Sequence, residues 1–188
     1  MIWMNMVNDL RSFPEIRQNY QFWFYQYPTS QPFWISATKF RTTLQNLYRN
    51  LDPGQQHVKL HQTVLVGHSM GGLLSLMQTI DSQDQMWNLI SNKPFGQLKA
   101  PQYIRQSLAR TVFFQPIPSV KKVVTIATPF QGSKMANDYT KWIGETLFQL
   151  PEPTDAIARQ LVKDNPGLFH NTRFLATKTS LESLKPEG

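Results

Sequence analysis

Cysteine is absent from this chain of 188 residues. Its absence excludes disulfides, thiolate metal ligands and cysteine catalysis, although it does not fix a compartment. The sequence also lacks a run of about 18 uninterrupted apolar residues, which argues against a membrane-spanning helix. Its apolar start, "MIWMNMVNDLRSFPEIRQ", has neither a basic region nor a small-residue cleavage site. We therefore expect no signal peptide and no transmembrane segment, and a cytoplasmic location by default.

Acidic side chains are missing from the middle of the sequence. No Asp or Glu lies between Gln85 and Asn137, whereas seven basic residues do, and this segment accounts for the whole net charge of +7. Such a segment can face nucleic acid, an anionic membrane surface or an acidic substrate, and it can also be a solvated insertion. Nucleic acid is not expected, because the basic residues are spread singly and no nucleic-acid-binding motif accompanies them.

The remaining composition, with 40% hydrophobic residues, is typical of a folded globular protein. We interpret residues 1–188 as a single domain. Short apolar runs predict buried strands, and apolar residues at a spacing of three to four predict amphipathic helices. The strands are expected at 19–28, 63–67 and 120–129. The helices are expected at 6–19, with a break at Pro14, and at 36–51, 71–90, 136–150 and 154–163.

The order of these elements indicates the fold class. Strands and helices alternate, and the strands are continuous apolar runs, which predicts parallel strands covered on two faces, the α/β class. Residues 91–119 interrupt the alternation with four prolines and an exposed-looking "TVFFQPIP". This insertion follows the 71–90 helix, and it is predicted to be a cap or lid, or else an ordinary loop insertion.

One motif carries chemistry, the stretch from Gly67 to Gly71, which reads "GHSMG". Because it joins a predicted strand to a predicted helix, G-x-S-x-G here predicts a nucleophile elbow, a strained turn that projects the Ser69 hydroxyl above the sheet edge. Glycine is expected at 67 and 71 because the strand and helix backbones approach closely there. The Met70 N–H would be one oxyanion donor, and His68 would line the site.

This glycine-rich turn has two other interpretations, a turn without chemistry and a phosphate-binding loop. The phosphate-loop pattern requires a lysine after its last glycine, but Leu73 follows Gly72. The dinucleotide pattern requires G-x-G-x-x-G, which glycines at 67, 71 and 72 do not provide. The nucleophile elbow is therefore the favoured interpretation.

The sequence around the motif resembles a known family. "VLVGHSMGGLLSLM" is similar to the elbow of α/β-hydrolases of the lipase and esterase kind, and "VVTIATPFQGS" to the strand and loop that follow it in bacterial lipase-like hydrolases. In that loop Phe130 stands where the family often has His. "YQFWFYQYPTS", "FRTTLQNL" and "TSLESLKPEG" also look like segments of one such bacterial group. The resemblance implies that Ser69 attacks a small-molecule or lipid ester and forms an acyl-enzyme, without a cofactor or metal.

The acid and base that should follow the serine are not evident. His170 is the sole histidine downstream of Ser69, and no β-branched strand precedes it. Asp81 and Asp84 are too close in sequence to the serine, and no other acid follows an apolar strand. In the family, the second oxyanion donor follows an earlier strand, which precedes the first helix in sequence and lies in the sheet between the strands that correspond to 19–28 and 63–67. This chain begins at that helix. We therefore expect the chain to be the central segment of a larger hydrolase, incomplete at both ends, with His170 as a weak candidate base.

Three functional hypotheses remain. The first is an ester hydrolase, in which 91–119, with Phe113, Phe114 and Ile117, could contact a lipid surface. The second is an inactive remnant or a binding module that keeps the centre of the fold. The third is an amidase, thioesterase or acyltransferase, which the elbow does not distinguish because fold does not fix function. The sequence does not predict the oligomeric state.

Overall fold

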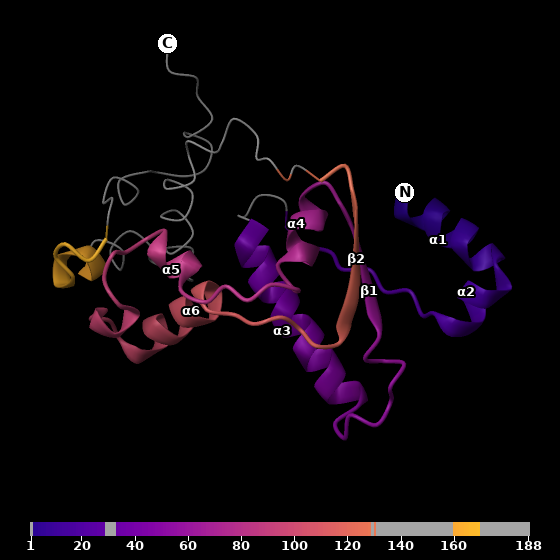
Figure 1. The fold of residues 1–188 in the computed structure, drawn as a ribbon, viewed down its shortest axis with the longest axis horizontal. Helices are drawn as coiled ribbons and strands as arrows, with labels where there is room; N and C mark the ends of the chain where they lie inside the picture. Colours follow the sequence, from indigo (N-terminus) through magenta and orange to yellow (C-terminus); the bar gives the residue numbers. More distant parts are fainter. Residues whose placement is uncertain (1, 29–32, 129, 131–159, 170–188) are drawn as a thin grey trace, which may run out of the picture.

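Two parallel strands lie at the centre of the computed structural model, which describes residues 2–28, 33–128, 130 and 160–169. They are β1 (Thr63–His68) and β2 (Val120–Ile126), paired from Thr63 with Val120 to His68 with Ile126. Figure 1 shows α3 (Phe33–Leu51) and α4 (Met70–Leu76) on one side of the strands, and α1 (Ile2–Ser12) and α2 (Pro14–Asn19) on the other. Helices together with a small parallel sheet place this part of the chain in the α/β class.

The long helix α3 supplies much of the packing behind β1. Its Phe40, Leu44 and Tyr48 are spaced by four residues, so they lie on one face and pack with Leu65 of β1 in a buried cluster. The helix begins three residues before the expected start at 36, and it ends at Leu51 before Asp52-Pro53-Gly54, as predicted. The N-terminal helix also divides at Pro14 as expected, because proline cannot donate the hydrogen bond that a helix interior requires.

The aromatic run at 19–28 was predicted to be a buried strand, and this prediction is wrong. Residues 20–28 have no assigned secondary structure, and Trp23 and Phe24 are exposed. Tyr25 and Tyr27, two residues apart, nevertheless point inward, and Tyr25 stacks on Phe40 of α3. The run therefore packs through one face, but it pairs with neither described strand, since the described sheet contains β1 and β2 alone.

Within the described part of the chain, one face of the two strands is closely packed and the other remains partly exposed, whereas two covered faces were predicted. Leu65 and Gly67 of β1 are buried toward the helices, whereas Val64 and Val66 are 38% and 39% exposed. On β2, Val124 and Ile126 are 47% and 40% exposed. The register places Val66 beside Val124, so the apolar side chains on the open face are contiguous.

The connection between the strands, which includes the insertion at 91–119, forms a second packed region. It contains α5 (Gln85–Asn88), the short 3-10 helix η1 (Phe95–Gln97) and α6 (Gln102–Val112). Its apolar side chains form a cluster with residues 161–169. The buried members are Trp87, Ile90, Leu98, Ile104, Leu108, Val112, Leu161, Leu168 and Phe169.

Two expectations for this connection are corrected by the structure. The stretch "TVFFQPIP" was expected to be exposed, but Val112, Phe114 and Ile117 are buried. The helix expected over 71–90 ends at Leu76, because Gln78 and Ser82 bond to the returning chain. Ile117 N–H donates to Gln78 O, and Ser82 exchanges hydrogen bonds with the Phe114 backbone.

The helix expected over 154–163 is described only from residue 160, where the chain is helical to 164. The helix expected over 136–150 lies outside the described residues. None of the described helices is long and apolar enough to cross a lipid bilayer.

Candidate functional site

The strained turn predicted at Ser69 is present. β1 ends at His68, and Ser69 follows with φ 52° and ψ −124°, immediately before α4 begins at Met70. A residue with a Cβ rarely adopts positive φ, so this backbone carries strain. Ser69 N–H donates to Ile126 O at 2.9 Å, and Ser69 O accepts from Gly72 N–H at 3.0 Å. These two bonds hold the strained residue, while its side chain is exposed above the ends of the strands.

The three glycines of the turn differ in what they contact. A Cβ on Gly67 would stand 2.3 Å from Gly71 O, so glycine is required there, as predicted. Among the described residues, a Cβ on Gly71 would meet only the Tyr27 hydroxyl, at 3.5 Å, so the expectation that 71 must be glycine is wrong, although its backbone does lie close to Gly67. The second position without room for a Cβ is Gly72, where a Cβ would lie 1.9 Å from Thr128 Oγ1. The second required glycine is thus at 72 and not at 71, because Gly72 faces Thr128 in the chain that follows β2.

Two residues near the turn were not singled out from the sequence, Tyr27 and Thr128. Thr128 packs against Gly72, and its buried hydroxyl oxygen has no hydrogen-bond partner in the described part of the chain. Burial raises the pKa of Tyr27, so its hydroxyl remains a hydrogen-bond donor at neutral pH. Tyr27 and Thr128 are both distant from Ser69 in sequence, and tertiary packing brings them to the turn. The one local signal was the "ATPFQGS" loop, which contains Thr128.

The ends of both strands contribute to this edge of the sheet. Ala127, the residue after β2, also has positive φ, 47°. Because His68 pairs with Ile126, the strained residues Ser69 and Ala127 follow neighbouring positions of the register. The carboxyl edge of parallel strands is where α/β proteins bind their ligands. The N–H groups of a helix's first turn have no acceptor within that helix, and Met70, the first residue of α4, directly follows Ser69.

The other predicted site residues are less informative. His68 is exposed on the open face of the sheet. His170, the candidate base, lies outside the described residues, as do most of the downstream acids. Asp81 and Asp84 were expected on the helix over 71–90. They are exposed in the turn region that follows α4. Within the described ranges, no cluster of three His, Cys, Asp or Glu side chains could hold a metal ion.

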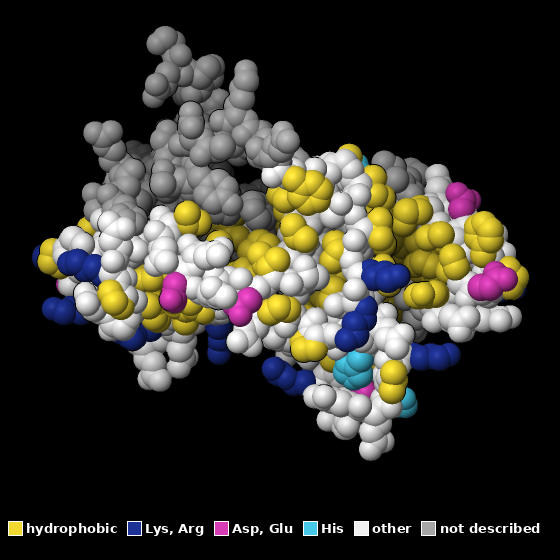
Figure 2. All heavy atoms as spheres, in the orientation of Figure 1, with side chains coloured by type: hydrophobic (Ala, Val, Ile, Leu, Met, Phe, Trp, Pro, Cys, Tyr) yellow, Lys and Arg dark blue, Asp and Glu magenta, His cyan; other side chains and the backbone are white. Residues whose placement is uncertain are grey.

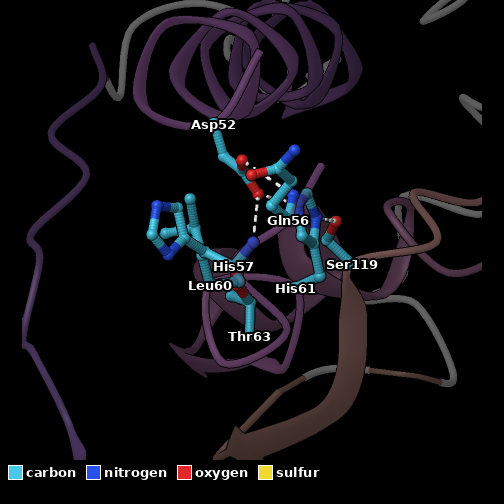
Figure 3. A network of polar contacts seen from close by, with 7 residues as sticks. All are labelled: Asp52, Gln56, His57, Leu60, His61, Thr63 and Ser119. Carbon is cyan, nitrogen blue, oxygen red and sulfur yellow. Dashed lines mark hydrogen bonds and ion pairs between the residues drawn. The ribbon is translucent and has the colours of Figure 1, made fainter. Parts of the chain in front are cut away.

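A serine, a histidine and an aspartate do meet elsewhere, at the opposite end of the strands (Figure 3). His61 Nδ1 lies 2.6 Å from Ser119 Oγ, and His61 Nε2 lies 3.0 Å from Asp52 Oδ2. Asp52 also accepts the backbone N–H groups of Gln56 and His57, at 2.9 and 2.8 Å. His57 and His61 precede β1 in the sequence, so they lie at the end of the strand that is away from Ser69.

This far-end cluster has a structural role. Ser119 is buried, and its backbone O accepts from Thr63 N–H, so the cluster fastens the loop after α3 to the first residues of both strands. The Asp52 carboxylate closes that loop by binding two backbone amides and His61. The ring of His57 points away from the carboxylate (Figure 3). The cluster thus fixes the register from which the strands run toward Ser69.

The Asp52→Asn variant is expected to be less stable than the wild type at pH 7, and this difference should shrink in acid. Burial raises the pKa of Asp52, but hydrogen bonds from His57, Gln56 and His61 lower it by a larger amount. The pKa of Asp52 is therefore below its ordinary value of 3.8. The carboxylate therefore stabilises the fold above about pH 4, and this contribution is lost as pH falls through the depressed pKa. Urea midpoints at pH 7, 4 and 3 measure the change. Asp9→Asn, an exposed change of equal charge, should show no such trend.

No family model, no curated protein and no solved structure matches this chain.

Proposed function

We propose that this protein is a serine hydrolase of the α/β-hydrolase kind, which cleaves a carboxylic ester with Ser69 as the nucleophile. The observation that carries the proposal is the backbone of Ser69, φ 52° and ψ −124°, between a parallel strand and a helix. Backbone strain on a residue with a side chain persists where the surrounding structure enforces it, and it concentrates at functional sites. Gly67 and Gly72 enforce it here, since neither has room for a Cβ.

The chemistry follows from the position of the hydroxyl. Ser69 Oγ is exposed and makes no hydrogen bond within the described part of the chain, so an ester carbonyl has access to it. Attack forms a tetrahedral oxyanion, which the Met70 N–H would stabilise, and collapse expels the alcohol and leaves an acyl-enzyme that water hydrolyses. A base must take the serine proton, and His170 is the candidate within this sequence. An amidase, thioesterase or acyltransferase would use the same first step.

Treatment with a fluorophosphonate probe is expected to label Ser69 if a base, for which His170 is the candidate, activates its hydroxyl. The probe phosphonylates a serine whose hydroxyl is activated by a base, and peptide mass spectrometry identifies the labelled residue. Ser69→Ala should abolish the label, whereas Ser12→Ala, which removes an exposed hydroxyl at the end of α1, should keep it.

The same assay separates the alternatives. Loss of the label in His170→Ala would identify His170 as the base. Absence of labelling at Ser69 in the wild type would show that this chain does not activate the serine, and it would favour the hypothesis of an inactive remnant or a binding module with the same turn.

A further inference from the structure

A large groove lies apart from the turn at Ser69. Its volume is about 1070 Å³, and none of the residues that line it belongs to that turn. One wall is the polar face of α3, where the lining residues recur at helical spacing from Thr38 to Arg49. The facing walls are formed by residues 81–84 and by the segment 110–118. This groove is therefore independent of the proposed active site.

Arg41 in the wall of this groove carries a buried charge. Its side chain is 6% exposed, and the guanidinium lies 3.9 Å from the centre of the Phe114 ring. One nitrogen, Nη2, donates to Met77 O, but Nε and Nη1 have no hydrogen-bond partner among the described residues. Burial lowers the pKa of Arg41 to about 10, so it remains charged at neutral pH.

No carboxylate balances this charge in the described part of the chain. The ion pair found there is that of His61 with Asp52, at the far end of the strands. Asp81 and Asp84 line the groove but form no ion pair with Arg41, and Asp81 accepts the Gln83 N–H instead. Two more guanidinium groups, of Arg49 and Arg110, also line the groove and are exposed. Figure 2 shows Lys and Arg side chains along the lower edge of the molecule.

The groove combines this positive charge with an apolar wall. Phe113, Phe114, Pro116 and Pro118 line it opposite the polar face of α3. A bare inorganic anion would occupy a small part of a volume that matches the upper range of small-molecule sites. An anion with an apolar body would use both features, because its head group would face the arginines and its body the aromatic and proline side chains.

We infer that the groove binds a small organic anion, whose carboxylate or phosphate group supplies the counter-charge that Arg41 lacks and whose apolar part lies against the 113–118 wall. Burying an unpaired cation is costly unless an opposite charge compensates it. Arg49 and Arg110 guide and contact the head group from the solvent side, and Arg41 acts through its uncompensated charge behind them. The inference does not depend on Ser69 being a nucleophile.

Calorimetric titration with four probes tests this inference. Octyl phosphate and octanoate carry the two kinds of head group, octanamide is neutral, and inorganic phosphate lacks the apolar body. At least one of the two octyl anions is expected to bind at least ten-fold more tightly than both octanamide and inorganic phosphate. The preferred anion identifies the head group. Equal binding of octanamide and both octyl anions, or no binding by any of them, would overturn the inference.

Variants locate the site. Arg41→Met should weaken binding of the preferred anion at least ten-fold, and Lys121→Gln, which removes an exposed cation outside the groove, should leave it unchanged. If Arg41→Met does not fold by circular dichroism, the exposed Arg110→Gln replaces it, with an expected loss of at least three-fold. Unchanged affinity in the folded groove variant would contradict the proposed location. Ser69→Ala should bind the anion like the wild type, which separates this result from the test of the hydrolase.

Discussion

Replacing Gly67 with Ala is expected to lower the free energy of unfolding by more than about 4 kcal/mol, or to prevent folding. The added Cβ would stand 2.3 Å from Gly71 O, 2.4 Å from Gly71 C and 2.5 Å from Gly72 N. All three are backbone atoms, which cannot rotate away as the end of a flexible side chain can. Strand β1 and helix α4 would have to separate, and the turn that presents Ser69 would be lost. Urea denaturation followed by circular dichroism measures the cost.

The matched control is the same substitution four residues later. Gly71→Ala adds a Cβ whose nearest neighbour is the Tyr27 hydroxyl at 3.5 Å, an ordinary contact distance. Alanine is favoured over glycine within a helix by up to about 1 kcal/mol, so this variant should be as stable as the wild type or slightly more stable. Gly72→Ala should lie between the two, because the Thr128 side chain, and not backbone, is in the way. Equal destabilisation by Gly67→Ala and Gly71→Ala would contradict the close approach at Gly67.

The two strands and the strained turn could be predicted from the sequence because their signals are local. An apolar β-branched run, a G-x-S-x-G pattern and a following helix occupy one continuous stretch, and the structure places β1, Ser69 and α4 within it. The tight glycine could not be assigned correctly, because the contact at Gly72 is made by Thr128, which is distant in sequence. A pattern specifies which residue turns, but not which neighbour will lie against it.

The covering of the sheet could not be predicted, because an apolar run does not specify its partner. Val64, Val66 and Val124 are as hydrophobic as a strand buried on both faces requires, yet one face of β1 and β2 is open. The run at 20–28 has strand composition, but β-structure also needs hydrogen bonds from a neighbouring strand, and no described strand pairs with it. The local pattern therefore predicted strands at three places, and the described structure has strands at two of them, β1 and β2.

The early end of α4 has the same explanation. The sequence after Leu76 continues with residues that a helix tolerates, and a helix to about 90 was predicted. In the structure Gln78 is fully buried, its side-chain amide bonds to Leu74 O and Ala37 O, and its own carbonyl accepts from Ile117 N–H. Tertiary hydrogen bonds to α3 and to the returning chain thus replace the next helical turn.

Ser69→Gly is expected to abolish ester hydrolysis and at the same time to raise the stability of the protein by about 1 kcal/mol. A residue with a Cβ held at φ 52° and ψ −124° costs roughly 1–3 kcal/mol, and glycine adopts such a backbone without that penalty. The greater freedom of glycine in the unfolded chain offsets about 0.5–1 kcal/mol of the gain. Urea denaturation measures the stability, and p-nitrophenyl butyrate hydrolysis measures the activity.

Ser69→Ala separates the two effects, because alanine removes the hydroxyl but keeps the Cβ and its strain. It should match the wild type in stability to within about 0.5 kcal/mol. If Ser69 is the nucleophile, the variant should also lose turnover by a factor on the order of a million, as removal of the nucleophile does in a serine protease. A Ser69→Gly variant less stable than the wild type would show that the strain does not lie at this residue, and hydrolysis that survives both substitutions would exclude Ser69 as the nucleophile. If both expectations hold, the chain retains a serine where glycine would be the more stable choice, and the hydroxyl is then the reason that the strain is kept.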